Sequence, residues 1–391
     1  MGNCLKPSNK KKKYGEKGQK PNAKRSKNLG EEDSKFLEDE ETRAIQFDLP
    51  SPNEICGWIS KWEENTGNFL YAAGKKINFY NYKTGKIVHT LLAHNSMISQ
   101  CEAFSSNLLT SSYDRTLKLF TLPSPPSSPK ESAKPKEETP STPSSSDCPK
   151  LKQTLKGHDL AVTSFCVDKP GMRVVSGARD YSVRVWDIET GTQEAQCLIN
   201  RNMVTSMNWI CNSNTSLVQC SEDLTFKIWD LRDAIQKVQQ VSVGPNIATC
   251  CDVDPTGNLI ATGHRAYENS GPALKVWDVR KLQCELFAYD GHRQPVEACN
   301  FISFKSGEEN SLGNTSIVTA SVDTSLHLVD INTGAMLAMF MDSIPAPYRC
   351  LGIVQSNKDN VNFIASNNMK TIQSFSVNSQ FQIQKTGNSA T

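Results

Sequence analysis

The stretch from Leu151 to Asp187, LKQTLKGHDLAVTSFCVDKPGMRVVSGARDYSVRVWD, constrains the fold more than any other part of the sequence. Apolar and polar residues alternate in four short pieces: LKQTL, AVTSFCV, RVVSG and SVRVWDI. This alternation is typical of half-buried β-strands and excludes an amphipathic helix. Turn signals, such as Lys169–Met172, separate the pieces, so the stretch predicts four short strands.

Four polar groups in this stretch fall where a folded sheet needs internal hydrogen-bond partners: His158, Ser176, Asp180 and Trp186. A turn aspartate that accepts from an imidazole, with a hydroxyl that bridges to the indole N–H, satisfies all four groups at once. We therefore predict that these residues form a structural tetrad.

The order GH, Asp, WD resembles the WD-repeat family, and the pattern recurs along the chain. The position of Trp186 is repeated at Tyr80, Phe120, Trp229, Trp277, Val329 and Phe375. The spacing is 40 to 52 residues, except for one gap of 66 residues. The resemblance implies an all-β fold, a seven-bladed WD-repeat β-propeller over residues 44–386.

The other repeats are less complete. The second and sixth keep a His, a Thr and an Asp: His94, Thr110 and Asp114, then His292, Thr319 and Asp323. The fourth has Asp223 and Trp229, with Asn200 where His is expected. In the fifth, HRAYENSGP begins at His264 in place of a short turn, and we expect His264 to reach the upper face of the propeller.

A propeller must close its ring, because an open end leaves a strand edge unpaired. In WD-repeat proteins the N-terminal strand usually completes the last blade, so the resemblance favours Ala44–Leu49 for this role. The alternative is Phe381–Lys385, which would supply the outer strand from the C-terminal end. Residues 387–391 are then a tail.

Residues 1–43 are predicted to be a disordered basic and acidic arm. Residues 5–28 carry a net charge of +9 and residues 31–41 a net charge of −6. Such segments bury too little apolar surface to offset the entropy of ordering. Gly2 is a candidate for myristoylation once Met1 is removed, although Lys6 stands where the usual pattern has Ser or Thr.

One myristoyl chain holds a membrane only marginally, so a second signal is needed. Cys4 is a candidate for palmitoylation, and four lysines would meet anionic headgroups: Lys10, Lys11, Lys12 and Lys13. The arm therefore predicts contact with an anionic membrane surface. A plain solvated tail, a nucleic-acid-binding arm and a nuclear import signal are alternatives; we expect no nucleic acid as a partner.

The 66-residue gap contains a Pro/Ser-rich insert, residues 121–150, which we expect to be a disordered loop between the third and fourth strands of its blade. Four residues precede Pro and suit proline-directed kinases: Ser124, Ser128, Thr139 and Thr142. Two PxxP motifs, Pro123–Pro126 and Pro126–Pro129, could dock an SH3 domain. An inert spacer is the alternative.

The sequence contains no GxSxG, GxxxxGK[ST], HExxH or GxGxxG motif. We therefore expect no enzymatic activity, no cofactor, no metal and no small-molecule substrate. Asp252, Asp254 and Gly257 faintly resemble a calcium loop, but a turn between strands explains them better. The 13 cysteines form no CxxC pair and many fall on strand patterns, which predicts small buried hydrophobes in a cytoplasmic protein.

Recognition of other proteins is the remaining function. In WD-repeat proteins the loops of the upper face commonly dock partners, and large or charged residues next to the tetrad positions are candidate anchors. They are Tyr113, Arg179, Arg201, Met203, Glu222 and Arg293. Ordinary solvated loop residues are the alternative.

The predicted function is thus a non-enzymatic scaffold. The segments SEDLTFKIWDLRD, LKVWDVR and GHRQPVEACNF and the Met-Gly start resemble a ciliary member of the family, which implies a link to cilia or membrane traffic. The alternative is a substrate receptor of a ubiquitin ligase, whose family device, an Arg after WD, is matched by Arg232 and Arg280.

Overall fold

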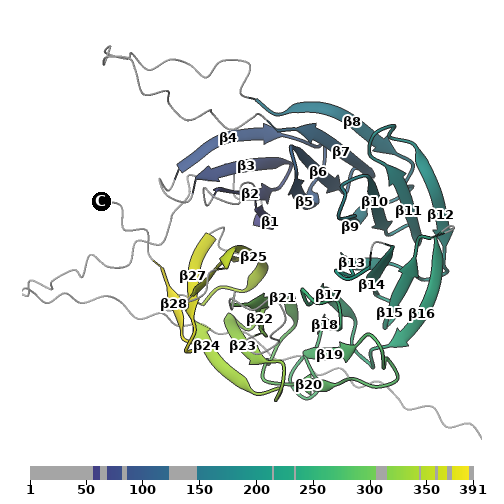
Figure 1. Cartoon of the computed structure of the whole chain (residues 1–391). Coiled ribbons are helices and arrows are strands. Elements are labelled where there is room, and N and C mark those ends of the chain that lie inside the picture. The colour runs from purple at the N-terminus through teal and green to yellow at the C-terminus, as the bar shows by residue number, and fades with distance from the viewer. Residues whose placement is uncertain are drawn as a thin grey trace, which may run out of the picture. The chain divides into compact units, whose positions relative to one another are not determined.

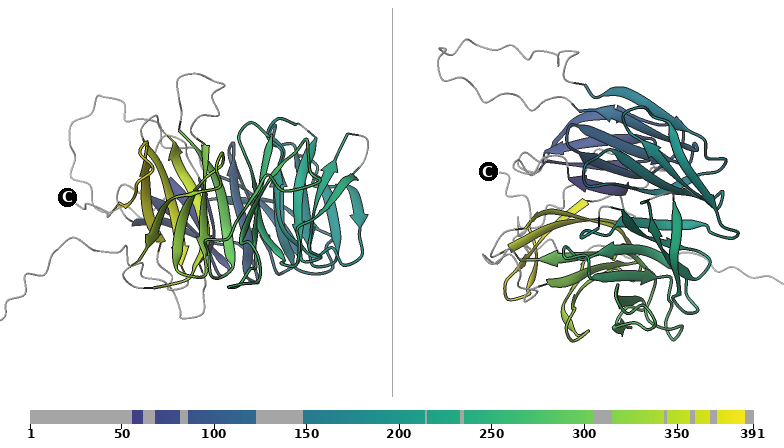
Figure 2. Two further views of the ribbon diagram at one scale, coloured as in Figure 1. Left: turned by 90° about the horizontal axis from the view of Figure 1, so that it is seen from below. Right: turned by 45° about the vertical axis from the view of Figure 1, so that its right-hand side comes forward.

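The computed structural model describes residues 56–61, 68–81, 86–122, 148–213, 215–232, 235–304, 315–342, 345–356, 360–367 and 372–386. No helix occurs among these residues; 28 strands form seven four-stranded antiparallel sheets. The sheets are the blades of a β-propeller, arranged in a ring (Figure 1). Figure 2 shows the strands running between the two faces of the ring.

Each blade is continuous in sequence, and its first strand lies innermost. Blade 1 contains β1 (Cys56–Lys61), β2 (Asn68–Ala73), β3 (Lys76–Asn81) and β4 (Lys86–Leu92). Blade 2 contains β5 (Ile98–Phe104), β6 (Asn107–Ser112), β7 (Thr116–Thr121) and β8 (Lys150–Lys156). Blade 3 contains β9 (Val162–Val167), β10 (Arg173–Ala178), β11 (Ser182–Asp187) and β12 (Gln193–Leu198). Blade 4 contains β13 (Val204–Trp209), β14 (Ser216–Ser221), β15 (Thr225–Asp230) and β16 (Gln236–Ser242).

The last three blades follow the same order. Blade 5 contains β17 (Ala248–Val253), β18 (Leu259–His264), β19 (Leu274–Asp278) and β20 (Phe287–Tyr289). Blade 6 contains β21 (Val296–Ser303), β22 (Thr315–Ser321), β23 (Ser325–Asp330) and β24 (Met336–Met341). Blade 7 contains β25 (Tyr348–Ser356), β26 (Asn360–Asn367), β27 (Ile372–Asn378) and β28 (Ile383–Lys385).

The four strands predicted for Leu151–Asp187 are present, but they belong to two blades. β8 is the outer strand of blade 2, whereas β9, β10 and β11 are the inner three strands of blade 3. The sequence repeat is therefore shifted by one strand relative to the blade. The Pro/Ser-rich insert connects β7 to β8, the third and fourth strands of blade 2, and residues 123–147 of it lie outside the described residues.

Among the described residues, no strand is shared between the two ends of the ring. β28 pairs with β27 and holds the outer place in blade 7, so the preference for Ala44–Leu49 in this role is wrong and the C-terminal alternative is correct. Ala44–Leu49 lie outside the described residues. At the junction of the two ends, apolar side chains of blades 1 and 7 pack together: Phe69, Tyr71, Ala73, Tyr80, Cys350, Ile364 and Ile372.

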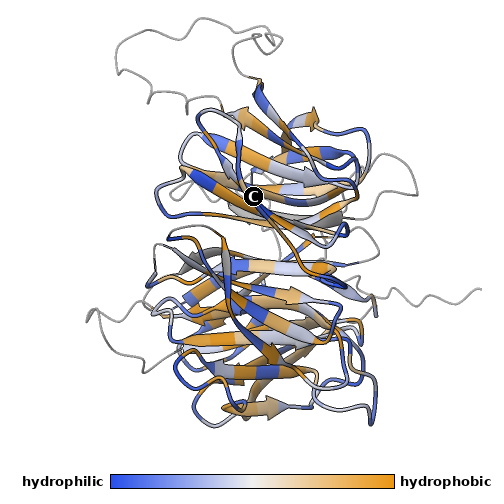
Figure 3. Cartoon of the chain, turned by 90° about the vertical axis from the view of Figure 1, so that its right-hand side faces the viewer, coloured by the Kyte–Doolittle hydropathy of each residue, from blue (hydrophilic) through white to orange (hydrophobic). Residues whose placement is uncertain are grey.

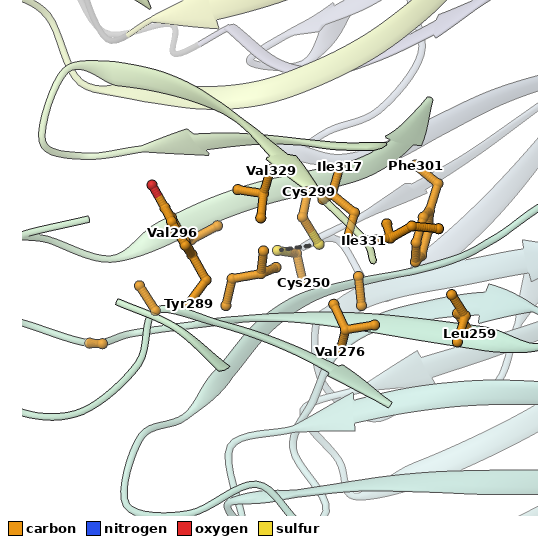
Figure 4. Packing of buried hydrophobic residues seen from close by; sticks show 14 residues of the cluster. Cys250, Leu259, Val276, Tyr289, Val296, Cys299, Phe301, Ile317, Val329 and Ile331 are labelled. Carbon is orange, nitrogen blue, oxygen red and sulfur yellow. Dashed lines mark hydrogen bonds between the residues drawn. The ribbon is translucent and has the colours of Figure 1, made fainter. Parts of the chain in front are cut away.

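Hydrophobic and hydrophilic residues alternate along the strands (Figure 3), and the buried hydrophobic side chains form clusters between neighbouring blades. Between blades 5 and 6, for example, Val276, Ile317 and Val329 are fully buried in one cluster. In this cluster the Sγ atoms of Cys250 and Cys299 lie 3.5 Å apart (Figure 4). Both thiols are free and buried, as predicted for cysteines that act as small hydrophobes.

Hydroxyl groups also join the innermost strands of neighbouring blades. At the same register position in blades 2 to 5, a Ser or Thr donates to a backbone carbonyl of the next inner strand, at 2.5 to 2.7 Å. The donors are Ser99, Thr163, Thr205 and Thr249, and the acceptors are Val162, Val204, Ala248 and Val296. These bonds set the stagger between adjacent blades, because a side-chain donor reaches only one carbonyl.

Closure by β28 can be tested with two truncations. Removal of residues 380–391 should lower the free energy of unfolding by about 2–4 kcal/mol, because Phe381 and Ile383 leave the cluster between blades 6 and 7. Removal of residues 1–50 should change it by less than about 0.5 kcal/mol. Urea unfolding measures both values, and a larger loss for the N-terminal truncation would contradict closure by β28.

Candidate functional site

A buried hydrogen-bond chain in blade 3 fixes two connections at one end of the blade. The ring of His158 lies 2.9 Å from Oδ2 of Asp180 through Nδ1 and 2.7 Å from Oγ of Ser176 through Nε2. Trp186 donates from Nε1 to the same Oγ at 2.8 Å. Asp180 also accepts from the backbone N–H of Asp159 at 2.9 Å. The carboxylate thereby joins the loop before β9 to the turn between β10 and β11.

Blades 2 and 6 contain the same chain without the Trp. In both, the His–Asp distance is 2.9 Å and the His–Thr distance is 2.7 Å. The residues are His94, Asp114 and Thr110 in blade 2, and His292, Asp323 and Thr319 in blade 6. Burial opposes ionisation of Asp180 and Asp323. Hydrogen bonds from the His, from a Ser and from a backbone N–H, together with the interaction with the His charge, outweigh it and hold the pKa of both carboxyls well below the usual range.

Blade 4 uses amides in place of the imidazole and the hydroxyl. Gln219 donates from Nε2 to Oδ1 of Asn202 at 2.7 Å, and Trp229 donates from Nε1 to Oε1 of Gln219 at 2.9 Å. The prediction that Asn200 takes the place of His is wrong. Asn200 is exposed, whereas Asn202 is fully buried, because only the second of the two Asn residues faces the Gln219 amide.

A basic side chain lies beside the network on the third strand of blades 2 to 6. Each pairs across the sheet with the Ser, Thr or Gln of its blade: Lys118, Arg184, Lys227, Lys275 and His327. In blade 4, which lacks the His, Lys227 is fully buried and its Nζ lies 2.6 Å from Oδ2 of Asp223. Burial lowers the pKa of Lys227, although the bond to Asp223 opposes the shift.

In blade 5 the histidine comes from a strand and not from a loop. His264 ends β18 and is 1% exposed, so the expectation that it reaches the upper face is wrong. Its Nε2 lies 2.9 Å from Oγ1 of Thr262, which also accepts from Nε1 of Trp277 at 2.9 Å. The HRAYENSGP insert thus adds surface loop while its first residue completes the buried network.

In blade 6, His327 packs below the network. Its ring stacks on the ring of His292 with a centroid separation of 3.8 Å, and its Nδ1 lies 2.7 Å from the hydroxyl of Tyr289. Burial and the neighbouring His292 lower the pKa of His327 to about 4, while Asp323 acts in the opposite direction. His327 is therefore neutral near pH 7.

The connections that these networks fix lie at one end of every blade, which we call the upper face. The register shows this in blade 3, where Val162 pairs with Ala178 and Ser182 pairs with Leu198. All six predicted anchors lie in these connections. Tyr113, Arg179, Arg201 and Arg293 are exposed, and Met203 and Glu222 are half-buried. Their role in partner binding stays a prediction.

The six anchors do not form one cluster. Arg179 of blade 3 and Glu222 of blade 4 approach each other, with 3.4 Å between Nη2 and Oε1, and so satisfy each other at the boundary of two blades. Arg293 follows His292 in the loop before β21, and Tyr113 belongs to the turn after β6. The structure therefore distributes the anchors over blades 2 to 6.

Four turns of the upper face share an unusual backbone. The residue after the turn Asp has a positive φ in blades 2, 3, 4 and 6: Arg115 (71°), Tyr181 (65°), Leu224 (64°) and Thr324 (70°). A non-glycine residue in this region costs about 1–3 kcal/mol unless its surroundings fix it. Here the Asp fixes it, since Asp180 accepts from the N–H of Ser182 at 2.9 Å, and the other three turns have the same bond.

Several exposed apolar residues of the upper face were not predicted from the sequence. They are Met97, Leu160, Tyr181 and Tyr267, with exposed fractions of 40%, 50%, 40% and 58%. Tyr181 could have been found, because it directly follows the tetrad residue Asp180. Tyr267 could not, because its position depends on hydrogen bonds that hold the insert, including Asn246 Nδ2 to the Ser270 carbonyl at 2.9 Å.

Other predicted sites are distinct from this face. Asp254 accepts from the N–H groups of Thr256 and Leu259 and turns the chain, as expected for a connection between strands. Within the described ranges, no three His, Cys, Asp or Glu side chains are arranged to hold a metal ion. In the same part of the chain, no helix is long and apolar enough to cross a bilayer.

The modification candidates cannot be placed. The lipidation residues Gly2 and Cys4 and the run Lys10–Lys13 lie outside the described residues. The same holds for the phosphorylation candidates Ser124, Ser128, Thr139 and Thr142. These assignments stay predictions.

Comparison with known proteins agrees with the fold. Residues 85–121 and 149–187, which cover much of blades 2 and 3, match the family described as WD domain, G-beta repeat. This is a repeat family, and it does not indicate an enzyme. Together with similar WD-repeat proteins, the matches support the WD-repeat family for this chain.

The similar proteins have varied names. A ribosome biogenesis protein WDR12 homolog of Arabidopsis thaliana is 25% identical over 285 residues, 65% of this chain and 59% of the relative. Kinesin-like protein KIF21A of Homo sapiens is 29% identical over 197 residues, 46% of this chain and 11% of the relative. Transducin beta-like protein 3 of Rattus norvegicus is 29% identical over 160 residues, 36% of this chain and 19% of the relative. The chain thus covers less than two thirds of the length of each relative.

The buried position of His327 predicts a pH-dependent stability. Its folded pKa of about 4 lies below the unfolded value of about 6.5, so the unfolded chain takes up the proton first as the pH falls. The contribution is complete above pH ~6.5 and about 3 kcal/mol is lost towards pH 4. His327→Gln should remove this part of the pH dependence, measured by urea unfolding between pH 7 and 4.5. Equal slopes in the variant and the wild type would contradict it.

Proposed function

We propose that this protein is a non-enzymatic scaffold that binds other proteins on the upper face of its propeller. The observation that carries the proposal is the coupling between the buried networks and the surface turns. In blade 2, Asp114 binds the buried His and also fixes the turn that exposes Tyr113. In blade 3, Asp180 does the same for the turn that exposes Arg179 and Tyr181.

Two physical properties of these turns suit a docking surface. Tyr and Arg are the residue types that most often supply binding energy at protein interfaces, because they combine large contact area with directional hydrogen bonds. A turn that is already fixed in the free protein loses little conformational entropy on binding. Exposed apolar residues next to the turns, Met97 and Leu160, add area that a partner could bury.

The names of the relatives are compatible with a scaffold, and they do not point to one common pathway. They include a kinesin-like protein, a ribosome biogenesis protein homolog and a transducin beta-like protein. Each of them resembles this chain over only a part of its own length, and one fold can serve different functions in different proteins. The assignment to one pathway must come from the partners themselves.

The upper face can be tested by affinity capture from a eukaryotic cell extract with the double variant Tyr113→Ala, Tyr181→Ala. Both side chains are partly exposed, so the fold should persist while recovery of bound partners falls roughly tenfold or more. The matched control is Arg232→Ala, Arg280→Ala, at the opposite ends of blades 4 and 5. If the Tyr variant recovers the same partners as the wild type, the upper face is not the docking surface.

The alternative, a substrate receptor of a ubiquitin ligase, is favoured by one observation. Arg232 and Arg280 follow the third strands of adjacent blades, are 75% and 71% exposed, and pair with Asp230 and Asp278 at 2.6 and 2.9 Å. The two guanidinium groups are thus held at the lower face in equivalent positions. Loss of ligase adaptor subunits from the Arg232→Ala, Arg280→Ala capture, and not from the Tyr variant, would support this alternative.

We further propose that the N-terminal arm tethers the scaffold to a membrane. The support is the order of signals in the sequence: Gly2, Cys4 and the run Lys10–Lys13. The segments that resemble WD repeat-containing protein 31 add a proposed link to cilia, with the protein otherwise cytoplasmic.

The tether is tested by the intact mass of the N-terminal peptide from protein made in eukaryotic cells. We expect the mass of a myristoyl group on Gly2, with or without palmitate on Cys4, and its loss in a Gly2→Ala control. An unmodified or acetylated terminus in the wild type would remove the lipid anchor, because a basic run alone binds membranes weakly and reversibly.

A further inference from the structure

The outer strand of blade 6 differs chemically from the other outer strands. β24 has the sequence MLAMFM, with no charged residue. The other outer strands of six or seven residues, β4, β8, β12 and β16, each contain at least one Lys or Glu. Charged residues on edge strands normally prevent pairing with another chain. β24 lacks this protection.

Four side chains of β24 are exposed apolar groups. Met336, Leu337, Met339 and Met341 have exposed fractions of 49%, 38%, 52% and 57%. The opposite face of the strand is packed against blade 7, where the rings of Phe340 and Phe375 lie 4.9 Å apart. Met-rich surfaces adapt to apolar partners, because the side chain is unbranched and flexible.

Short neighbours explain why this strip is open. Met339 and Met341 pair across the sheet with His327 and Ser325, so they share the face of blade 6 that packs on blade 5. In blade 5 the outer strand β20 has only three residues. In blade 7, on the other side of blade 6, the outer strand β28 also has three residues. Figure 1 shows β24 on the outer perimeter of the ring between these two strands. β24 is therefore accessible from the side.

The backbone of β24 adds directional bonding groups. β24 is the last strand of its sheet, and no strand pairs with its outer edge among the described residues. An edge of this kind binds an extended segment through main-chain hydrogen bonds, with alternate side chains giving specificity. An uncharged strand with apolar side chains complements this edge, and the described part of this chain offers one outer strand of at least six residues with that chemistry, β24 itself.

We propose that two copies of this protein pair through β24, antiparallel and related by a two-fold axis. A two-fold axis at Met339 places Met339 opposite Met339 of the second copy and Leu337 opposite Met341 of the second copy. Charge complementarity permits this contact, because a neutral strand meets a neutral strand; a Lys or Glu would face its own copy. Each copy contributes one strand of six residues, fewer than the roughly 20–30 residues a side of a standard interface, so the dimer is weak and depends on concentration.

The test is sedimentation velocity of the full chain, made in bacteria to leave the N-terminus without lipid, over a roughly hundredfold concentration range. We expect a monomer of 43.3 kDa that converts to a species of twice that mass as the concentration rises. Met339→Lys should remain monomeric throughout, because two ammonium groups then face each other at the axis. Recovery of a dimer on mixing Met339→Lys with Met339→Glu would support the pairing.

The matched control is Val238→Lys on β16, an exposed apolar position in the middle of another outer strand (64%, against 52% for Met339). It should dimerise as the wild type does, and circular dichroism should show that both Lys variants keep the β fold. A wild type that stays monomeric over the whole range overturns the proposal and leaves the strip to a partner with a different sequence. A dimer that Met339→Lys leaves intact, or that Val238→Lys abolishes, also overturns it.

Discussion

The interaction on which the structure depends is the buried bond between a turn aspartate and the polar chain behind it. In blade 3, Asp180 accepts from His158 and from two backbone N–H groups, and His158 continues the chain to Ser176 and Trp186. A buried polar group without a partner is costly, so each member is stable only when the others are present. The network therefore holds the blade together and fixes the turns above it in one step.

The blades satisfy their buried polar groups with different residues. Where a His is present, its ring faces the Asp; in blade 4, which has no His, the ammonium group of Lys227 reaches Asp223 from the third strand instead. His264 in blade 5 enters from the end of β18, and no turn Asp is needed. What is constant is a buried carboxylate, amide or hydroxyl with a donor within hydrogen-bond distance, because a low-dielectric interior penalises any other arrangement.

Strand length at the perimeter determines the outer surface. Outer strands of six or seven residues cover the faces of neighbouring blades, whereas β20 and β28 have three residues each and leave parts of blade 6 uncovered. β28 nevertheless completes the last blade, and the ends of the ring are joined by packing of residues such as Phe69 and Ile364. Buried polar networks thus fix the turns of the upper face, and the lengths of the outer strands determine which surfaces are exposed at the perimeter.

The sequence by itself determined the seven blades, the strands of the complete repeat, the tetrad of blade 3 and the His, Thr and Asp sets of blades 2 and 6, because alternation and spacing are local properties of the chain. Only the tertiary structure decided that Asn202 and not Asn200 is buried, that His264 points inward and that β28 takes the outer place in blade 7. Each of these depends on which side chain meets a partner from a distant strand. Local patterns do not contain that information, since a shift of one residue in register moves a side chain from the core to the solvent.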